Sequence, residues 1–327
     1  MNMGSTSNHA THVENTLETN GAAQTEIAAS WRRSKLLHHL SPDYRRPPER
    51  ISSHELKQAR EKLGPLIHTA ETSLDNLYLA VGNAGCCVVL ADASGIAVDR
   101  RGAGSDEKTY DEWGLCTGAL WSEESEGTNG IGTCIVEQRA LTIHKDQHFH
   151  SKNINLSCSA APIFDHEGHL LAAIDVSSSR ADLTPDFARI ISLSVINAAR
   201  QIESEYFRQT YHNADIVLAT PPAEQKKSST NLQTALLAVD QDGIVIGASR
   251  GARRIYGLKN GPLKEPILLA DLQGKQVNHA KEYELAERRV ILQALAHTGG
   301  NISAAATAMG ISRATLHRKI KFMKLAI

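Results

Sequence analysis

Three short helices separated by glycines are predicted at the carboxyl end of the chain, between about residues 282 and 324. On one face of the first helix lie Ala286, Val290, Ile291, Ala294 and Leu295. This spacing is typical of an amphipathic helix, and residues 299–301, Gly-Gly-Asn, end it. The second helix is alanine-rich, with Ser303 as its expected N-cap and Gly310 as its stop, and Ser312 caps the third. Two helices joined by a tight glycine turn indicate a helix-turn-helix.

The third of these helices has an apolar stripe and a basic remainder. Leu316, Ile320 and Met323 are spaced to face a core, and from Gly300 to the end the chain has no acidic residue and five Lys or Arg. One-sided positive charge is expected of a surface that faces phosphates. We expect base contacts from Arg313, Thr315 and His317. Candidate contacts to phosphate or at the helix starts are Asn301, Ser303, Ser312, Arg318, Lys319, Lys321 and Lys324.

Upstream, the pattern of apolar residues changes to the alternation of strands. Residues 86–102 read as a hairpin, and the segments RALTIHK, SCSAAPIFD and HLLAAIDVS read as three more strands. A helix is expected from about Thr128, and a long one from Thr184, its cap, with Pro185 in its first turn. A second hairpin surrounds the Asp-Gln-Asp-Gly turn at 240–243. Sheets and helices in separate stretches of the chain predict an α+β fold.

The long helix carries an apolar stripe. Its members are Phe187, Ile191, Val195, Ala198, Ile202 and Tyr206. Such a stripe belongs either to the core or to a dimer interface. We favour a homodimer, because helix-turn-helix proteins usually read two half-sites.

The amino-terminal part of the chain is less regular. Residues 1–25 are polar and predicted to be disordered. A helix that contains Trp31 follows, then a proline-rich break at 42–48, then a helix from about Ser53 with Glu55 in a capping box.

Composition narrows the class of protein. The chain has 327 residues, 41% hydrophobic residues and a formal net charge of -1, which is typical of a globular protein of two or three domains. It has no apolar run long enough to cross a membrane and no secretory signal. Its five cysteines form no CxxC pair, so we expect reduced thiols, as in a cytoplasmic protein. We expect it to be associated with the nucleoid.

The carboxyl-terminal run GGNISAAATAMGISRATLHRKIKF resembles the Fis-type helix-turn-helix that ends bacterial enhancer-binding activators. The separated blocks SWRRS, WSEESEGTNGIGT, HF, CSAAPIFD and DVS resemble, in order, the sensor region of the acetoin-catabolism-regulator family. That resemblance implies a GAF domain, a six-stranded antiparallel sheet with a ligand pocket on one face. The second hairpin resembles the opening of a PAS-like domain.

These resemblances predict a domain order. We expect a disordered segment at 1–25, a helical segment at 26–84, a GAF sensor domain with its long helix at 85–211, a linker at 212–232, an abbreviated PAS-like α/β module at 233–278 and an all-α helix-turn-helix at 279–327. Full-length relatives carry an ATPase domain, whose phosphate loop reads GxxxxGK[ST]. No such run occurs in this chain, so we expect no ATP hydrolysis.

The sensor blocks supply the candidate ligand site. Its expected residues are Trp121, Glu126, Thr128, Asn129, His148, Phe149 and Cys158. An alternative is a redox or metal sensor built from Cys158 and the cluster His144, His148 and His150, because thiolate and imidazole bind zinc and iron. The glycines at 127, 130 and 132 do not match the GxGxxG of a dinucleotide site.

The sequence therefore predicts a non-enzymatic, cofactor-free transcription regulator that binds promoter DNA and a small-molecule effector, an alcohol, a ketone or an aromatic metabolite. RNA polymerase is a further candidate partner, and no membrane is expected. One alternative is a truncated partner that restrains a full-length ATPase activator by heterodimerisation. Another is an enzyme that reduces methionine sulfoxide with Cys116, Cys134 or Cys158 as nucleophile.

Overall fold

A computed structural model describes residues 3–19, 25–220, 235–273, 279–323 and 325. The chain forms two compact units, Met1–Pro266 and Ile267–Ile327. The division falls inside the segment predicted as the PAS-like module. Each unit is described by itself below.

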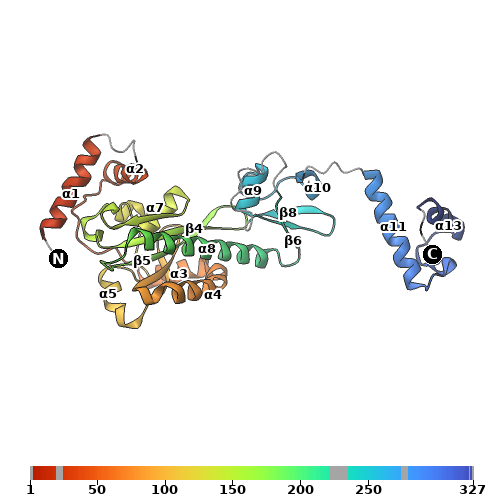
Figure 1. The fold of residues 1–327 in the computed structure, drawn as a ribbon, viewed down its shortest axis with the longest axis horizontal. Coiled ribbons are helices and arrows are strands. Elements are labelled where there is room, and N and C mark those ends of the chain that lie inside the picture. The colour runs from red at the N-terminus through yellow and green to blue at the C-terminus, as the bar shows by residue number, and fades with distance from the viewer. Residues whose placement is uncertain (1–2, 20–24, 221–234, 274–278, 324, 326–327) are drawn as a thin grey trace. The chain divides into compact units, whose positions relative to one another are not determined.

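The first unit is built on an antiparallel sheet in the order β2-β1-β5-β4-β3 (Figure 1). The strands are β1 (Cys86–Asp92), β2 (Ala97–Arg101), β3 (Leu141–His144), β4 (Ser157–Phe164) and β5 (Leu170–Ser178). The sequence predicted all five, whereas the resemblance implied six. The central strands β1, β4 and β5 are buried along almost their whole length, because helices or loops cover both faces.

Two long helices cover one face of this sheet, α4 (Gly64–Val81) and α8 (Pro185–Thr210), which pack against each other. The Thr184 side chain caps α8 as predicted, and α3 (Ser53–Lys62) has the expected capping box between Ser52 and Glu55. The predicted stripe of α8 faces inward: Ile191, Val195, Ala198 and Ile202 belong to the core with Leu74 and Val88. These four residues are therefore not free to form a dimer interface.

Short elements and loops cover the other face. They include α5 (Glu107–Glu112), α6 (Glu123–Glu126) and α7 (Gly130–Glu137), with the single turns η4 (Gly104–Asp106), η5 (Lys145–Gln147) and η6 (Ser151–Asn153). The turn η3 (Gly82–Ala84) follows α4, and its Ala84 packs against the core on the α4 side. A second core lies beneath the short elements of the other face, where Val89 and Cys158 of the sheet meet Tyr110, Trp121 and Ile131. Candidate sensor residues are concentrated on this face.

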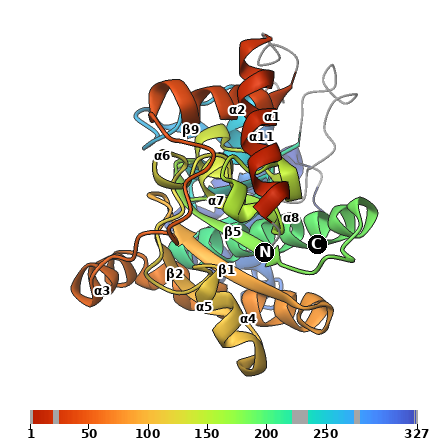
Figure 2. The same ribbon diagram turned by 90° about the vertical axis from the view of Figure 1, so that its left-hand side faces the viewer.

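The amino-terminal segment differs from the prediction of disorder. Helix α1 (Met3–Glu18) lies beside α2 (Glu26–Arg32), which continues into a π-helical turn, η2 (Arg33–Leu37) (Figure 2). Val13 is fully buried with Trp31 and Phe149, and the His9 ring lies 3.0 Å from the carbonyl oxygen of His148. The helix has few apolar residues, but His9 and Val13 are one turn apart and dock on partners that are distant in sequence.

A second, smaller sheet follows α8. It contains β6 (Asp215–Leu218), β7 (Leu236–Val239) and β8 (Ile244–Ala248) side by side, and α9 (Arg250–Tyr256) follows with Ser249 as its cap. Strand β6 lies within the predicted linker, where the Asp-Ile-Val-Leu run is too short to stand out in the sequence. Phe207 of α8 packs against Leu236 and Ala238 of this sheet.

The second unit begins with β9 (Ile267–Leu268) and α10 (Leu269–Leu272) and continues with α11 (His279–His297), α12 (Ile302–Ala308) and α13 (Arg313–Phe322). The core of the three-helix part joins Ile291, Ala305, Leu316 and Ile320. Asn301, not Ser303, is the N-cap of α12, since its side-chain oxygen accepts from the backbone N–H groups of residues 303 and 304. Gly310 has φ of 67° and ends α12, and this left-handed conformation is unstrained only for glycine.

In the described part of the chain, no helix has the length and hydropathy that a bilayer-spanning segment requires.

Candidate functional site

Helix α13 presents its predicted basic side chains to solvent. Ser312 caps the helix by accepting from the backbone N–H of Thr315. The exposed basic residues of α13 are Arg313, His317, Arg318 and Lys321. Leu316 and Ile320 hold the opposite side in the core. The helix is thus fixed by its apolar face and leaves guanidinium, imidazole and ammonium groups available to a nucleic acid.

Some of the other residues predicted to contact DNA also form contacts within the protein. The Lys319 ammonium forms an ion pair with Glu287 of α11, so it fixes α13 to α11. The half-buried Thr315 has its hydroxyl 2.8 Å from that of Ser312. Asn301 and Ser303 are exposed at the start of α12. Lys324 lies outside the described residues.

The sensor face is held together by a polar network that begins on α2. The Ser30 hydroxyl donates to Glu123 Oε2 at 2.8 Å and lies 2.7 Å from Thr128 Oγ1. Arg33 donates twice to the Glu123 carboxylate, at 2.6 and 3.1 Å, and contacts Glu137 at 2.7 Å. Because Glu123 is buried and charged, these donors offset its desolvation.

A second buried ion pair lies at the other end of α6. Glu126 is 2% exposed, and Lys152 Nζ lies 2.8 Å from its carboxylate. Burial raises the pKa of Glu126, and Lys152 opposes that rise. Lys152 also lies over the Tyr44 ring, 5.2 Å from its centroid. Glu126, a predicted ligand residue, therefore already has a charged partner.

Trp121, Thr128 and Asn129, also predicted ligand residues, are buried and engaged with the protein. The Trp121 indole donates to the Gly114 carbonyl at 2.9 Å. Asn129 caps α7, since its Oδ1 accepts from the backbone of Gly132 at 2.8 Å. These residues shape the loop that leads into α7, with the start of that helix directed at the sheet.

At the centre of the sensor face, polar side chains from three elements meet. Cys158 Sγ of β4 lies 3.4 Å from His148 Nε2 and 3.1 Å from the Ser177 hydroxyl of β5. Ser177 also donates to Asp175 Oδ2 at 2.6 Å. The other oxygen, Asp175 Oδ1, is buried without a hydrogen-bond partner in the described structure. We call His148, Cys158, Asp175 and Ser177 the sensor cluster.

Two glycines let the α7 loop approach this cluster closely. A Cβ on Gly130 would lie 2.6 Å from both Asp175 Oδ1 and Cys158 Cβ. A Cβ on Gly127 would lie 2.7 Å from the Phe149 ring. Close packing explains both glycines, and neither forms a phosphate loop.

The structure argues against the metal and redox alternatives. The His144 ring is hydrogen-bonded to Ser157 Oγ, and the His150 ring is hydrogen-bonded to the Ser41 carbonyl, so neither is hydrogen-bonded to His148 through Nδ1. No three His, Cys, Asp or Glu side chains gather as a metal site within the ranges the structure describes. All five cysteines are buried and unpaired, and burial raises the pKa of Cys158 well above its ordinary value. A reactive thiolate needs the opposite shift.

Sequence reasoning missed several residues of this site. They are Ser30, Arg33, Glu123, Lys152, Asp175 and Ser177. The signal was present, because all except Lys152 lie in the SWRRS, WSEESEGTNGIGT and DVS blocks. Such blocks indicate the domain, but they do not show which of their side chains the fold brings together.

Replacing Asp175 by Asn should change how stability depends on pH. Burial raises the pKa of Asp175 to about 7, against about 4 in an unfolded chain. The folded state therefore holds this proton more tightly, and the stability contributed by the neutral carboxyl is lost as pH rises through about 7. The free energy of unfolding of Asp175→Asn, measured relative to the unsubstituted chain by urea denaturation, should rise between about pH 4 and 7 and level off above that range.

Comparing the Asp175→Asn variant with the unsubstituted chain isolates the contribution of the Asp175 carboxyl to the pH dependence of stability. Burial lowers the pKa values of His148 and His150 to about 4, which acts in the opposite direction but equally in both chains. Exposed Asp242 provides the control, and Asp242→Asn should give a flat difference. A flat difference for Asp175→Asn as well would show that the carboxyl is already ionised when folded.

Comparisons with known proteins agree with this geometry. Residues 65–202 match the GAF domain family, and residues 283–322 match "Bacterial regulatory protein, Fis family". The acetoin catabolism regulatory protein of Cupriavidus necator is 30% identical over 281 residues, 84% of this chain and 41% of that protein. The acetoin dehydrogenase operon activator AcoR of Bacillus subtilis is 27% identical over 179 residues, 55% of this chain and 29% of that protein.

The chain thus spans less than half the length of either relative. Among solved structures, a chain of the Escherichia coli DhaR(N)–DhaL complex superposes with a TM-score of 0.52 at 16% identity, covering 75% of this chain and 80% of that one. That likeness supports the fold alone. The chain carries a GAF domain and a helix-turn-helix of the Fis family, and its homologues include acetoin catabolism regulators.

Proposed function

We propose that this chain is an effector-responsive transcription regulator that binds promoter DNA through α13. The observation that carries the proposal is the exposed basic surface of this helix, in a module that matches the Fis family. Arg313 is the first residue of α13, and recognition helices read base edges with their amino-terminal residues. Arg313, Thr315 and His317 would contact bases, while Arg318 and Lys321 would contact phosphates.

The GAF domain would bind the effector and bias DNA binding. The named relatives regulate acetoin catabolism and an acetoin dehydrogenase operon, and acetoin is a small hydroxyketone. A small alcohol or ketone would find hydrogen-bond partners in Cys158, Asp175 and Ser177, which lie among apolar residues. We propose such a molecule as the effector class.

The regulator would act as a homodimer without hydrolysing ATP. Paired half-sites are the usual target of helix-turn-helix proteins, and the sequence given contains no GxxxxGK[ST] run. It would act in the cytoplasm, where it meets DNA and could contact RNA polymerase directly.

The test is binding of the purified chain to labelled duplexes from the region upstream of its own gene, at several salt concentrations. Binding should weaken steeply as salt rises, because phosphate contacts release counterions. A scrambled duplex should bind at least tenfold more weakly. Equal, salt-insensitive affinity for both duplexes would refute the proposal, and sedimentation of the complex would give its stoichiometry.

A further inference from the structure

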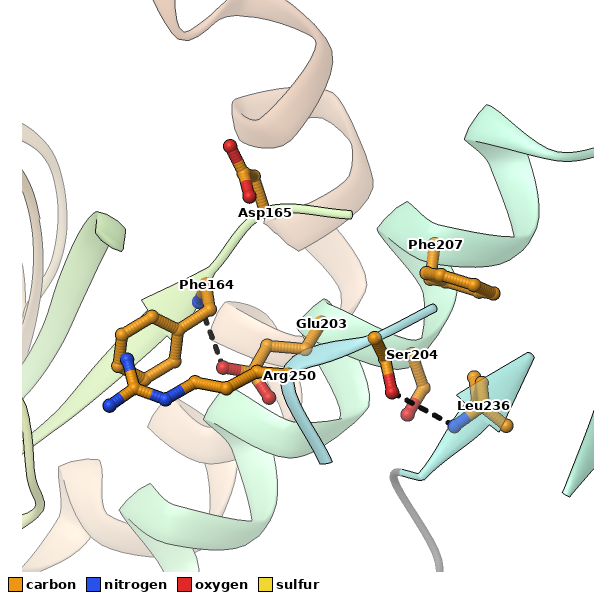
Figure 3. Close-up of a pocket in the computed structure, with 8 residues that line it drawn as sticks. Phe164, Asp165, Glu203, Ser204, Phe207, Leu236 and Arg250 are labelled. Atoms are coloured by element: carbon orange, nitrogen blue, oxygen red, sulfur yellow. Dashed lines mark hydrogen bonds between the residues drawn. The ribbon is translucent and has the colours of Figure 1, made fainter. Parts of the chain in front are cut away.

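The arginine that begins α9, just after the small second sheet, reaches the GAF domain. Arg250 is the first residue of α9, and its guanidinium lies over the Phe164 ring, 3.4 Å from the centroid (Figure 3). Arg250 Nη1 also donates to Gln138 Oε1 at 3.2 Å. Phe164 ends β4, and Gln138 is the C-cap residue directly after α7. One side chain thus touches the ends of two elements of the sensor domain.

A buried carboxyl completes this junction. Glu203 Oε1 of α8 accepts from the backbone N–H of Phe164 at 2.8 Å, and Figure 3 shows both beside Arg250. Burial raises the pKa of Glu203 to about 7, and the positive charge of Arg250 opposes that rise. The junction encloses a cavity of about 10 Å³, roughly the space of one water molecule. The side chains that line this cavity are therefore closely packed, so a small shift of one displaces its neighbours.

The other ends of the same two elements form the sensor face. Helix α7 starts at Gly130, which is packed against Asp175 and Cys158. Strand β4 carries Cys158 six residues before Phe164. A helix of eight residues spans about 12 Å, and six residues of strand span about 20 Å. Both elements are short and hydrogen-bonded along their length, although the pairing of β4 with β5 shifts register between Ile163 and Phe164. A shift at the sensor cluster would therefore move the residues that Arg250 contacts.

We propose that Arg250 transmits the state of the sensor cluster to the second sheet, by joining the ends of α7 and β4 to α9. This inference rests on the proposed function, because it assigns a route by which an occupied GAF domain would be read. A planar guanidinium suits the role, since it stacks on an aromatic ring and donates hydrogen bonds in its own plane at once.

A competing route exists along α8. This helix runs without interruption from the GAF core to Phe207, which packs against Leu236 and Ala238 of the second sheet. A signal carried by α8 would survive loss of Arg250, whereas a signal carried by Arg250 would not. The two routes therefore predict different results for one substitution, and physical adjacency alone does not decide between them.

The experiment perturbs the sensor face without needing an effector. Asn129→Ala removes the cap of α7, and Ser177→Ala is a milder second perturbation of the cluster. Amide hydrogen exchange is measured in β8 and α9 of the full chain, with each perturbation in the unsubstituted, Arg250→Ala and Arg250→Lys backgrounds. Arg254→Ala, an exposed arginine on the same helix, is the matched control background.

In the unsubstituted and Arg254→Ala backgrounds, each perturbation should speed exchange in β8 and α9 roughly fivefold or more. In the Arg250→Ala background this response should be lost, and Arg250→Lys should restore little of it. Transmission that persists in Arg250→Ala would overturn the proposal in favour of α8, and no transmission in any background would overturn it outright. Duplex binding of the same samples tests the proposed function separately, because exchange does not depend on DNA.

Discussion

Replacing Arg33 by Ala should destabilise the GAF-containing unit by about 3 kcal/mol, since removing one partner of a buried ion pair leaves an uncompensated charge. Glu123 has a side chain only 1% exposed, and Arg33 gives it two hydrogen bonds. Water can reach the partly exposed Arg33 but not the carboxylate. In the variant the buried carboxylate keeps the Ser30 hydroxyl as a donor but loses its cationic partner. Urea denaturation followed by tryptophan fluorescence would measure the loss.

The neighbouring arginine provides a matched control. Arg32 is exposed on the same helix, so Arg32→Ala removes the same number of atoms and the same charge. Its free energy of unfolding should change by less than about 0.5 kcal/mol. Equal losses for the two variants would mean that the Arg33–Glu123 pair contributes nothing specific. A loss confined to Arg33→Ala would show that the SWRRS block belongs structurally to the sensor domain.

The pairing of Arg33 with Glu123 illustrates what the sequence could not reveal. The two residues are separated by 90 positions, and neither lies in an apolar pattern that reports burial. The same holds for Asp175, an acid in a strand whose neighbours are buried on both faces. Alternation predicts which residues form a strand but not which charged side chain it buries.

The elements themselves were largely predictable, because each rests on local chemistry. Thr184 and Pro185 mark the start of α8, and Ser312 marks the start of α13. Helix α1 was missed because its stability depends on two buried residues, His9 and Val13, and on distant partners such as Trp31. Tertiary contacts outweighed a polar local sequence there.

The stripe of α8 shows a different limit. Periodicity identified Ile191, Val195 and Ile202 as one face, but it could not tell a core from an interface, since both bury the same residues. The structure buries this face within the chain. Outside the stripe, α8 exposes Ile190 and Leu193 to solvent, so a dimer through α8 would use these residues, which no sequence pattern distinguished.

Arg313→Ala should cost on the order of 1 to 3 kcal/mol in binding to the specific duplex and should relax sequence preference. Arg313 is exposed at the amino-terminal end of α13, and a guanidinium in the major groove can donate two hydrogen bonds to guanine. Because the side chain faces solvent, its loss should leave the fold intact. Fluorescence anisotropy with specific and scrambled duplexes would give both affinities, and circular dichroism would check the helices.

Two further variants separate base reading from charge. Lys321→Ala removes an exposed charge from the same helix and should weaken binding to all duplexes equally, reducing the slope of affinity against salt by about one. Arg289→Ala removes an exposed charge from α11 and should change neither the affinity nor the slope. If Arg313→Ala behaves like Lys321→Ala, Arg313 contacts only phosphate and another residue of α13 reads the bases. If Arg313→Ala behaves like Arg289→Ala, α13 does not lie in the groove. A recognition helix in the groove would place Arg313, its first residue, against the duplex.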